Sequence, residues 1–372
     1  MNILVINLDK AIFSPGSKSL ERLKEYSQLV DKIFVIVWTR NKEEPIVFEN
    51  KLFIYPTNSA SRLSYYFDTF KISRKILKEH KIDLIFTQDP FETGLAGWFI
   101  ARKNRTRLQL QVHTDFLSPY FWRESLANKL RVRLGKFLIR RADGFRVVSE
   151  RIKMSLIALG VVEEKIFVLP IFVDVGKIQA SLPGASLKEK YPQFDFLILM
   201  ASRLSREKNI GLAIEAMLDI IKKYPKAGLI VVGSGDEEES LKSKVRNLKL
   251  ADSVVFEPRA DDLASYYKSA DLFLLASNYE GWGMSVPEAM AAGCPVLMTD
   301  VGCAGEVVVN NENGLVVPVN DRAAVCETIE RIISEPALIQ KFKESGLKIK
   351  DFLMTKEEYF AKYKNSWEFC LK

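Results

Sequence analysis

The 372-residue sequence has little of what several protein classes require. It contains only two histidines, and its four cysteines (Cys294, Cys303, Cys326 and Cys370) show no spacing typical of a metal site. We therefore expect no bound metal ion. No apolar run reaches the roughly eighteen residues that a membrane-spanning helix needs, and no low-complexity tract or short repeat is present.

The N-terminus also lacks the pattern of a secretory signal. Met1-Asn2-Ile3-Leu4-Val5 enters an apolar stretch without a basic leader or a small-residue cleavage site, which is typical of a first strand. This pattern, together with cysteines that show no metal-ligand spacing, favours a cytoplasmic protein whose thiols are reduced.

What is present indicates an ordinary globular protein of two domains. Hydrophobic residues make up 48% and charged residues 27% of the chain, whose length exceeds what one core usually organises. Short β-branched runs alternate with longer helical patterns, and many of the runs are continuously apolar. Strands of that kind are buried on both faces, as in parallel sheets covered by helices. The predicted strands are 2–8, 32–38, 52–55, 84–87, 108–112, 145–149, 166–169, 196–201, 229–232, 254–257, 272–276, 296–299 and 314–317.

The predicted boundary lies between residues 171 and 195. Pro170, a polar stretch and the Pro183-Gly184 turn signal separate one series of strands from the next. We therefore expect two Rossmann-like α/β domains, 1–172 and 173–354, with the carboxyl ends of their parallel strands facing a shared cleft.

The densest functional signal runs from Asn278 to Gly293. It follows an apolar strand and enters a helix predicted to begin at about Pro287. Gly281 and Gly283 allow close approach of the backbone to a ligand, and Glu280 and Glu288 supply two carboxylates eight positions apart. Carboxylates that converge on one cleft suit a polyhydroxylated ligand. A solvated loop glutamate and a helix-start glutamate are the alternative interpretation.

Arg203 and Lys208 form a second signal, in the loop between the strand 196–201 and a helix that begins near Asn209. Two cations five positions apart in such a loop suit a diphosphate, because arginine offers a planar fork and lysine a point charge. A charged surface loop is the alternative.

These motifs resemble those of the retaining glycosyltransferases of family 4, which have the GT-B fold. The segment from Glu280 to Glu288 is similar to the family's Glu-x7-Glu signature, and Arg203 and Lys208 to its Arg-x4-Lys pyrophosphate site. The resemblance covers nearly the whole C-terminal half and, more weakly, the N-terminal half. It implies that Glu280 lies by the transferred sugar and Glu288 binds the ribose. The loop residues expected to line the donor site are Gly281, Trp282, Gly283, Met284 and Ser285.

The same resemblance implies further site residues. His113, at the end of the strand 108–112, is similar to a histidine that contacts the sugar, although a lone histidine is more often structural. Asp115 is a weaker candidate on the acceptor side. Gly16 stands where family members have two glycines, so a plain turn is an equal alternative there. Gly233 and Arg259 follow strands at positions near the donor and its base.

The expected activity is metal-independent, retaining transfer of a sugar from a UDP- or GDP-sugar to a glycan or lipid-linked acceptor. The nucleotide-sugar is then a co-substrate, and no cofactor is needed. Two cations at the diphosphate would stabilise the leaving group in the transition state. The alternatives are a catalytically silent nucleotide-sugar-binding subunit and an epimerase of the same fold. The resemblance also implies that the final helix, within 355–372, crosses back to the N-terminal domain; packing on its own domain is the competing view.

A basic segment in the first half predicts a further partner. From Leu126 to Arg141 the pattern is helical, with a cationic stripe beside an apolar one. The stripes consist of Lys129, Arg133, Lys136 and Arg140, and of Leu126, Leu130, Leu134, Phe137 and Leu138. The pattern favours an anionic membrane surface, with Phe116, Tyr120, Phe121 and Trp122 as aromatic contacts, and a peripheral position on the inner face of the membrane. A core-packed helix with a solvated face is the alternative. No nucleic-acid motif accompanies the charge.

Overall fold

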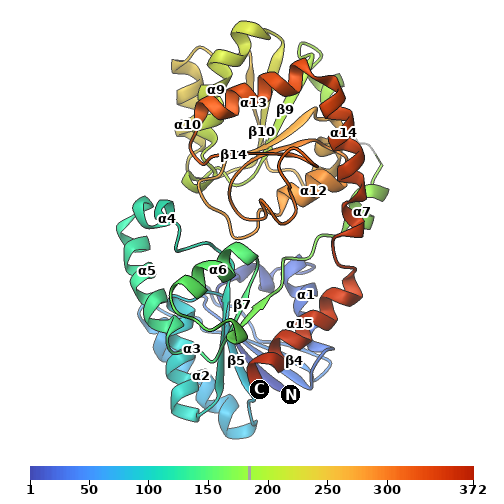
Figure 1. Cartoon of the computed structure of the whole chain (residues 1–372). Helices are drawn as coiled ribbons and strands as arrows, with labels where there is room; N and C mark the ends of the chain where they lie inside the picture. Colours follow the sequence, from blue (N-terminus) through green and yellow to red (C-terminus); the bar gives the residue numbers. More distant parts are fainter. Residues whose placement is uncertain (183–185) are drawn as a thin grey trace. The chain divides into compact units, whose positions relative to one another are not determined.

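The computed structural model describes residues 1–182 and 186–372, so the Pro183-Gly184 turn signal lies outside the described residues. The chain divides into two compact α/β units, each built on one β-sheet (Figure 1). The first contains residues 1–117, 125–170 and 356–372, and the second contains residues 118–124 and 171–355. The prediction of two domains with parallel sheets is confirmed.

The sheet of the first unit has the order β3-β4-β2-β1-β5-β6-β7-β8, and all its pairs are parallel except β3 with β4. Its strands are β1 (Asn2–Asn7), β2 (Lys32–Val37), β3 (Ile46–Phe48), β4 (Leu52–Pro56), β5 (Leu84–Thr87), β6 (Arg107–Val112), β7 (Gly144–Val147) and β8 (Ile166–Val168). Sequence did not predict β3, because it has three residues and Val47 at its centre is 62% exposed. No buried run marks it.

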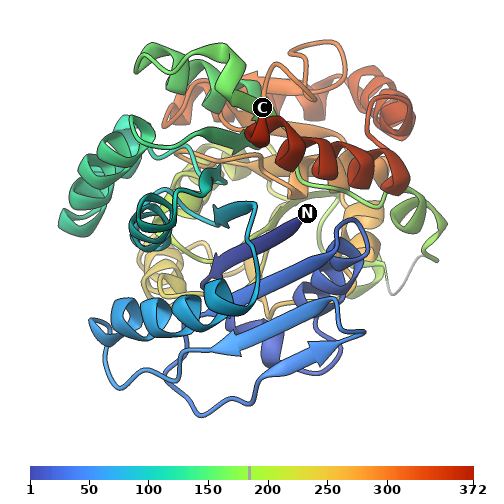
Figure 2. The same cartoon turned by 90° about the horizontal axis from the view of Figure 1, so that it is seen from below.

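Helices cover both faces of this sheet (Figure 2). α2 and α3 contact β1, β2, β5 and β6, whereas α15 contacts β5, β6 and β7 and shares ring contacts with α1. The helices are α1 (Lys18–Ser27), α2 (Ser64–Glu79), α3 (Glu92–Asn104), α5 (Leu126–Ile139), α6 (Glu150–Ala158) and α15 (Lys356–Leu371), with 3-10 turns η1 (Lys10–Phe13) and η2 (Glu163–Lys165).

The last helix packs through aromatic rings. Tyr363 stacks on Tyr26 of α1 with ring centroids 4.3 Å apart, and Trp367, which is fully buried, stacks on Phe86 of β5. Burial of large aromatic side chains dominates the energetics of such contacts. α15 is therefore an integral part of the first unit, although it ends the chain.

The sheet of the second unit has the order β11-β10-β9-β12-β13-β14, with every pair parallel. Its strands are β9 (Phe196–Ala201), β10 (Ala227–Val232), β11 (Val254–Glu257), β12 (Leu272–Leu275), β13 (Val296–Thr299) and β14 (Leu315–Val317). β9 and β12 are central neighbours although their first residues, Phe196 and Leu272, are 76 positions apart in sequence, so the loops that follow them emerge at one edge of the sheet.

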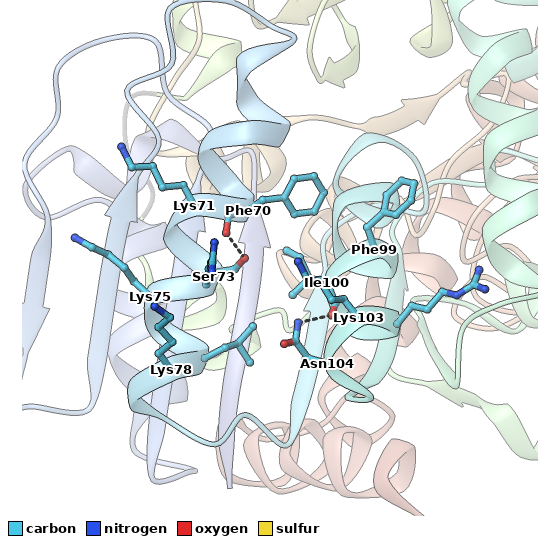
Figure 3. A pocket seen from close by; sticks show the side chains of 12 residues that line it. Phe70, Lys71, Ser73, Lys75, Lys78, Phe99, Ile100, Lys103 and Asn104 are labelled. Atoms are coloured by element: carbon cyan, nitrogen blue, oxygen red, sulfur yellow. Dashed lines mark hydrogen bonds between the residues drawn. The ribbon is translucent and has the colours of Figure 1, made fainter.

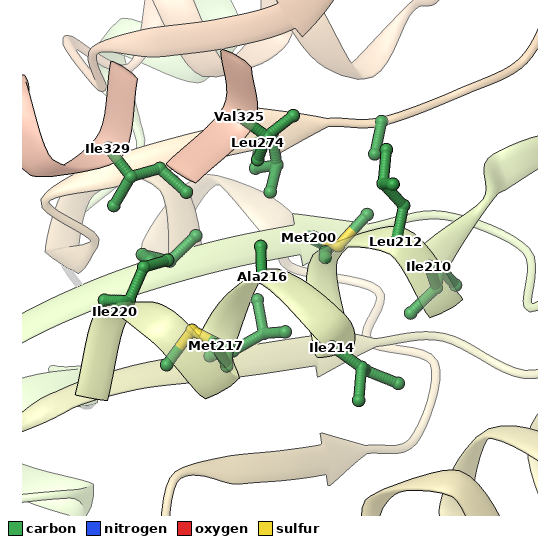
Figure 4. Close-up of a cluster of buried hydrophobic side chains, with 14 of the residues drawn as sticks. Met200, Ile210, Leu212, Ile214, Ala216, Met217, Ile220, Leu274, Val325 and Ile329 are labelled. Carbon is green, nitrogen blue, oxygen red and sulfur yellow. The ribbon is translucent and has the colours of Figure 1, made fainter. Parts of the chain in front are cut away.

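The helices of the second unit are α4 (Pro119–Glu124), α7 (Val175–Ala180), α8 (Leu187–Lys190), α9 (Ile210–Lys223), α10 (Glu238–Asn247), α11 (Leu263–Ser269), α12 (Ser285–Ala291), α13 (Arg322–Ser334) and α14 (Pro336–Leu347), with 3-10 turns η3 (Arg206–Lys208) and η4 (Lys348–Asp351). Figure 4 shows the core beside α9, where Ala216 and Ile220 pack near Leu274 of β12 and near Val325 and Ile329 of α13. This packing fixes the sheet whose loops carry the candidate site.

Candidate functional site

Lys208 and Glu280 form an ion pair at the carboxyl edge of the second sheet. Lys208 ends η3 in the loop after β9, and Glu280 lies in the loop after β12. Their side chains are 15% and 11% exposed, and the Ser277 hydroxyl donates to the same Glu280 Oε1 at 2.8 Å. Two residues 72 positions apart in sequence are thus brought together because β9 and β12 are adjacent.

A backbone hydrogen bond and a side-chain hydrogen bond hold the two loops against each other. The Asn278 amide donates to the Glu207 carbonyl at 2.7 Å, and Asn209 Nδ2 donates to Asn278 Oδ1 at 3.1 Å. Asn209 has φ +48°, which lets the chain turn sharply from η3 into α9. The position of Lys208 is therefore fixed by the loop as well as by its carboxylate partner.

Arg203 occupies the same loop but has a different partner. Its guanidinium donates to Glu207 Oε1 at 3.0 Å, and its side chain is 80% exposed. Arg203 is thus a solvated cation beside a nearly buried one. Only Lys208 of the predicted pair contacts Glu280.

Glu288 lies on α12, which begins at Ser285, two residues before Pro287, the residue near which its start was predicted. The Val286 amide already bonds the Gly283 carbonyl at 2.9 Å, so the helical turn starts before the proline. The hydroxyl of buried Tyr267 donates to Glu288 Oε2 at 3.2 Å. Burial raises the pKa of Tyr267 well above its usual value, and Glu288 adds to the rise, so Tyr267 remains a donor.

The loop between the two glutamates is largely buried. Gly281, Trp282 and Gly283 are buried, Met284 and Ser285 are half-buried, and Gly283 has φ +83°. The indole Nε1 of Trp282 is buried without a hydrogen-bond partner among the described residues. Such a donor is costly to leave unpaired in a native fold.

Sequence reasoning missed Gly302, which follows β13 at the same sheet edge. A Cβ at this position would lie 2.5 Å from the Trp282 carbonyl oxygen and 2.9 Å from Glu280 Cβ. The loop that presents Glu280 can therefore pack only against a glycine. Ser277 and Tyr267, the hydrogen-bond donors to the two glutamates, were also missed. The sequence signal that could have identified Gly302 is its position just after a buried strand, β13.

Gly233 joins the loops after β9 and β10. It has φ +146°, and a Cβ there would lie 1.9 Å from the Ser202 carbonyl oxygen. The structure thus gives a packing reason for this glycine. Arg259 is exposed after β11, the edge strand, with two strands between β11 and β12.

The first unit holds the remaining candidates. His113 follows β6, and its Nε2 lies 3.0 Å from Gln111 Oε1. Burial lowers the pKa of His113 to about 3, and Arg146 and Arg22 act in the same direction. The imidazole is therefore neutral near pH 7. Asp115, two residues further on, is half-buried.

Gly16 lies between η1 and α1 with φ +68°, and a Cβ there would meet no heavy atom within 4 Å. Its surroundings are open, unlike those of Gly233. The positive φ accounts for a glycine at this turn without a ligand.

The aromatic cluster predicted to touch a membrane is wrong for two of its members. Phe116 is 1% exposed and packs edge-to-face on Phe91, and Phe121 is 7% exposed and packs on Tyr279. Phe121 belongs to α4, a segment of the second unit whose Glu124 accepts a hydrogen bond from the Tyr279 hydroxyl. Phe121 is thus buried beside the Glu280 loop, whereas Phe116 is buried within the first unit. Trp122 remains 37% exposed.

α5 has features of both interpretations of its pattern. Its buried face consists of Asn128, Val132, Gly135, Leu138 and Ile139, so Leu138 of the predicted apolar stripe faces the core. Leu126, Leu130 and Phe137 are nevertheless 77%, 63% and 38% exposed. The helix packs on one face and presents a second apolar strip beside its cations.

Two features are absent from the residues that the structure describes. No group of three or more histidine, cysteine, aspartate or glutamate side chains could hold a metal ion there. In the same part of the chain, no helix is long and apolar enough to cross a membrane.

Comparison with known families decides which proteins these features belong to. Residues 187–349 match the model described as Glycosyl transferases group 1, and residues 26–177 match Glycosyltransferase Family 4. Between them the two models cover most of both units. The chain belongs to the family 4-like GT-B glycosyltransferases.

Relatives and solved glycosyltransferases agree with this placement. The chain is 31% identical over 240 residues to the alpha-monoglucosyldiacylglycerol synthase of Streptococcus pneumoniae. This alignment covers 61% of this chain and 54% of the relative. It is 29% identical over 208 residues to the capsular polysaccharide biosynthesis glycosyltransferase CapM of Staphylococcus aureus, with 54% and 55% covered. The chain thus spans about half the length of these curated relatives.

The GT-B fold extends over the whole chain. The crystal structure of Anabaena HepE in complex with UDP and glucose superposes with a TM-score of 0.78 at 20% identity, covering 99% of each chain. The predicted family and fold are confirmed, and the chain is a member of a transferase family. The roles of the individual residues stay predictions.

Proposed function

We propose that this glycosyltransferase moves a hexose from a nucleoside diphosphate sugar to a glycan or lipid-linked acceptor, without a metal ion and with retention at the anomeric carbon. The observation that carries the proposal is the Lys208–Glu280 ion pair, in which a cation and a carboxylate meet at the ends of neighbouring parallel strands. Ligands of open α/β sheets bind at this edge.

The chemistry follows from the charges. When the bond between sugar and phosphate breaks, the diphosphate gains negative charge, which Lys208 and Arg203 stabilise as a point charge and a planar fork. Glu280 then accepts hydrogen bonds from sugar hydroxyls, and Glu288 from the ribose. The ion pair holds Lys208 in place until the donor competes for it.

His113 acts as a neutral group in this proposal. Its pKa of about 3 excludes a permanent positive charge near pH 7. Because Nε2 bonds Gln111, Nδ1 is the ring nitrogen left for a substrate hydroxyl. We assign it to the positioning of the sugar or acceptor.

The relatives suggest the substrates. HepE was crystallised with UDP and glucose, which favours UDP over GDP as the nucleotide. The names of the pneumococcal and staphylococcal relatives refer to a glucosyldiacylglycerol and to a capsular polysaccharide, which supports a lipid or polysaccharide acceptor.

The proposed membrane partner is an anionic lipid surface that contacts α5. Exposed Leu126, Leu130 and Phe137 can enter the interface while Arg133, Lys136 and Arg140 face anionic headgroups. The protein would then be peripheral on the inner face of the membrane.

The decisive experiment pairs binding with chemistry. Thermal unfolding with UDP, GDP and their hexose derivatives identifies the donor, because a ligand that binds the folded state stabilises it. Labelled donor plus diacylglycerol or glycan acceptors, with and without a chelator, then reports transfer. Glu280→Ala should keep nucleotide-induced stabilisation and lose transfer. Free epimerised sugar nucleotide, or stabilisation without any product from a full acceptor panel, would contradict the proposal.

A further inference from the structure

A basic groove lies between α2 and α3 of the first unit, with a volume of about 1310 Å³. Its residues extend from the middle of α2 and from the second half of α3 toward the carboxyl ends of these helices, which lead into the amino ends of β5 and β6. His113 instead follows the carboxyl end of β6. The groove is therefore at the sheet edge opposite to the candidate residues of this unit.

Aromatic and aliphatic side chains form the inner part of the groove. Phe70 of α2 points toward α3 in Figure 3, and its ring lies edge-to-face with that of Phe99, with ring centroids 6.3 Å apart. Leu77 and Ile100 extend this lining. Phe99 is 48% exposed, and Phe67, one helical turn before Lys71, is 74% exposed. The apolar lining thus continues onto the surface.

The rim of the groove is cationic. Lys71, Arg74, Lys75 and Lys78 are spaced three, one and three residues apart, so they share one side of α2. Arg102 and Lys103 stand on α3, with Arg102 over the Trp98 ring. All six are exposed, and none makes an ion pair within residues 1–182 and 186–372. The described lining contains no aspartate or glutamate.

The combination selects one kind of occupant. Six like charges in a lining without acidic side chains favour an anion, and an apolar floor beneath them favours one that carries hydrocarbon. A polysaccharide would not need the floor. Nucleic acid would need aromatic faces free for stacking, whereas Phe70 and Phe99 are engaged with each other.

We propose that the α2–α3 groove binds one anionic phospholipid of a bilayer, with the phosphodiester among the rim cations and part of an acyl chain against Phe70, Leu77, Phe99 and Ile100. The proposal rests on the membrane contact proposed for α5 and gives it a lipid site. The two surfaces are adjacent, since Trp98 of α3 packs edge-to-face on Phe137 of α5 at 5.3 Å. Binding requires neither donor nor transfer.

The first test measures sedimentation of the full chain with phosphatidylcholine vesicles that contain or lack phosphatidylglycerol. The triple variant Lys71→Gln, Lys75→Gln, Lys78→Gln should bind the anionic vesicles at least about tenfold more weakly, since each surface cation contributes to the attraction. The matched control, Arg246→Gln, Lys348→Gln, Lys350→Gln, removes the same charge from exposed positions of the second unit and should bind within about twofold of the unchanged chain. Equal weakening of both variants would overturn the site.

The second test locates the lipid. A phosphatidylglycerol with a photoreactive acyl chain should label peptides of α2 and α3, and Phe99→Gln should reduce that labelling while the thermal unfolding midpoint stays unchanged. Labelling that maps outside both helices would overturn the proposal. Competition gives a second contrary outcome. If a short oligonucleotide displaces the chain from vesicles as effectively as excess anionic vesicles do, the proposal is also overturned.

Nucleotide-induced stabilisation, measured without vesicles, separates this proposal from the proposed transfer. If the groove variant loses lipid binding and keeps its response to nucleotide, the groove is confirmed independently of catalysis. If nucleotide has no effect on any variant while lipid labelling persists in α2 and α3, the transferase proposal fails and the lipid site stands.

Discussion

The Nε2 atom of His113 lies 3.0 Å from Oε1 of Gln111, and this contact fixes the tautomer of the imidazole. Arg146 Nη1 donates to the same oxygen at 3.2 Å, and Gln111 Nε2 donates to the Tyr363 hydroxyl at 3.0 Å. Because arginine can only donate, the atom facing His113 is the amide oxygen. His113 therefore carries its proton on Nε2. Tyr363 of the final helix holds the Gln111 amide in the orientation that determines this tautomer.

His113 should stay neutral through the physiological range. Its pKa of about 3 means that ring signals of His-labelled protein remain constant from pH 8 to pH 5 and show the Nε2–H tautomer. Since the chain has two histidines, His80→Gln leaves only the signals of His113. A midpoint near pH 6.5 would contradict the assignment.

The same pKa makes stability depend on pH. Between pH 6.5 and 3 the unfolded chain binds a proton at His113 and the folded chain does not, so stability falls as pH falls in this window. The slope is at most about 1.4 kcal/mol per pH unit. Above pH 6.5 the contribution is complete. His113→Gln should remove this slope, as urea unfolding at pH 6.5 and pH 5 would measure, and an unchanged slope would refute the coupling.

Tyr363→Phe should destabilise the chain by about 1 kcal/mol. The ring that stacks on Tyr26 is retained, and only the hydroxyl that accepts from Gln111 is lost. Urea unfolding measures the change. Tyr224→Phe is the control, since no described side-chain hydrogen bond uses its hydroxyl, and it should change stability by less than about 0.5 kcal/mol.

Lys208→Met should abolish transfer and destabilise the second unit by about 3 kcal/mol, because Glu280 is left nearly buried without its cation. Adding Glu280→Gln removes the unpaired charge and should recover most of the stability but no activity. Lys226→Met, which breaks an exposed pair with Asp195, should cost less than about 1 kcal/mol. Equal costs for the two lysines would contradict the burial argument.

Gly233→Ala should cost more stability than Gly16→Ala. Both glycines have positive φ, but only at position 233 does a Cβ collide with backbone, 1.9 Å from the Ser202 carbonyl oxygen. We expect about 1 kcal/mol for Gly16→Ala and at least about 3 kcal/mol for Gly233→Ala. Thermal unfolding compares them, and similar midpoints would show that the loops after β9 and β10 separate easily.

The cationic stripe of α5 should give salt-dependent membrane binding. Replacing Lys129, Arg133, Lys136 and Arg140 by Gln should weaken binding to anionic vesicles at low salt and leave little difference at high salt, where the charges are screened. Vesicle flotation at both salt concentrations measures this. Unchanged binding at low salt would exclude α5 as the contact surface.

Sequence predicted the strands well wherever a continuous apolar run lies in a buried parallel sheet. β9 (Phe196–Ala201) and β11 (Val254–Glu257) have the predicted bounds, and α15 (Lys356–Leu371) lies within the predicted range 355–372. The three-residue β3 escaped prediction, because an exposed edge strand needs no buried run. The start of α12 was placed two residues late, because a proline tolerated in the first turn need not be its first residue.

The sequence by itself determined the alternation of strands and helices and the residue types at the strand ends, since both depend on local pattern and composition. Only the tertiary structure decided which of those ends meet. Lys208 contacts Glu280 because β9 pairs with β12, and Tyr363 reaches Gln111 because α15 packs on the first sheet. Such contacts join residues 72 and 252 positions apart, and they depend on strand order and helix packing, which no local pattern encodes.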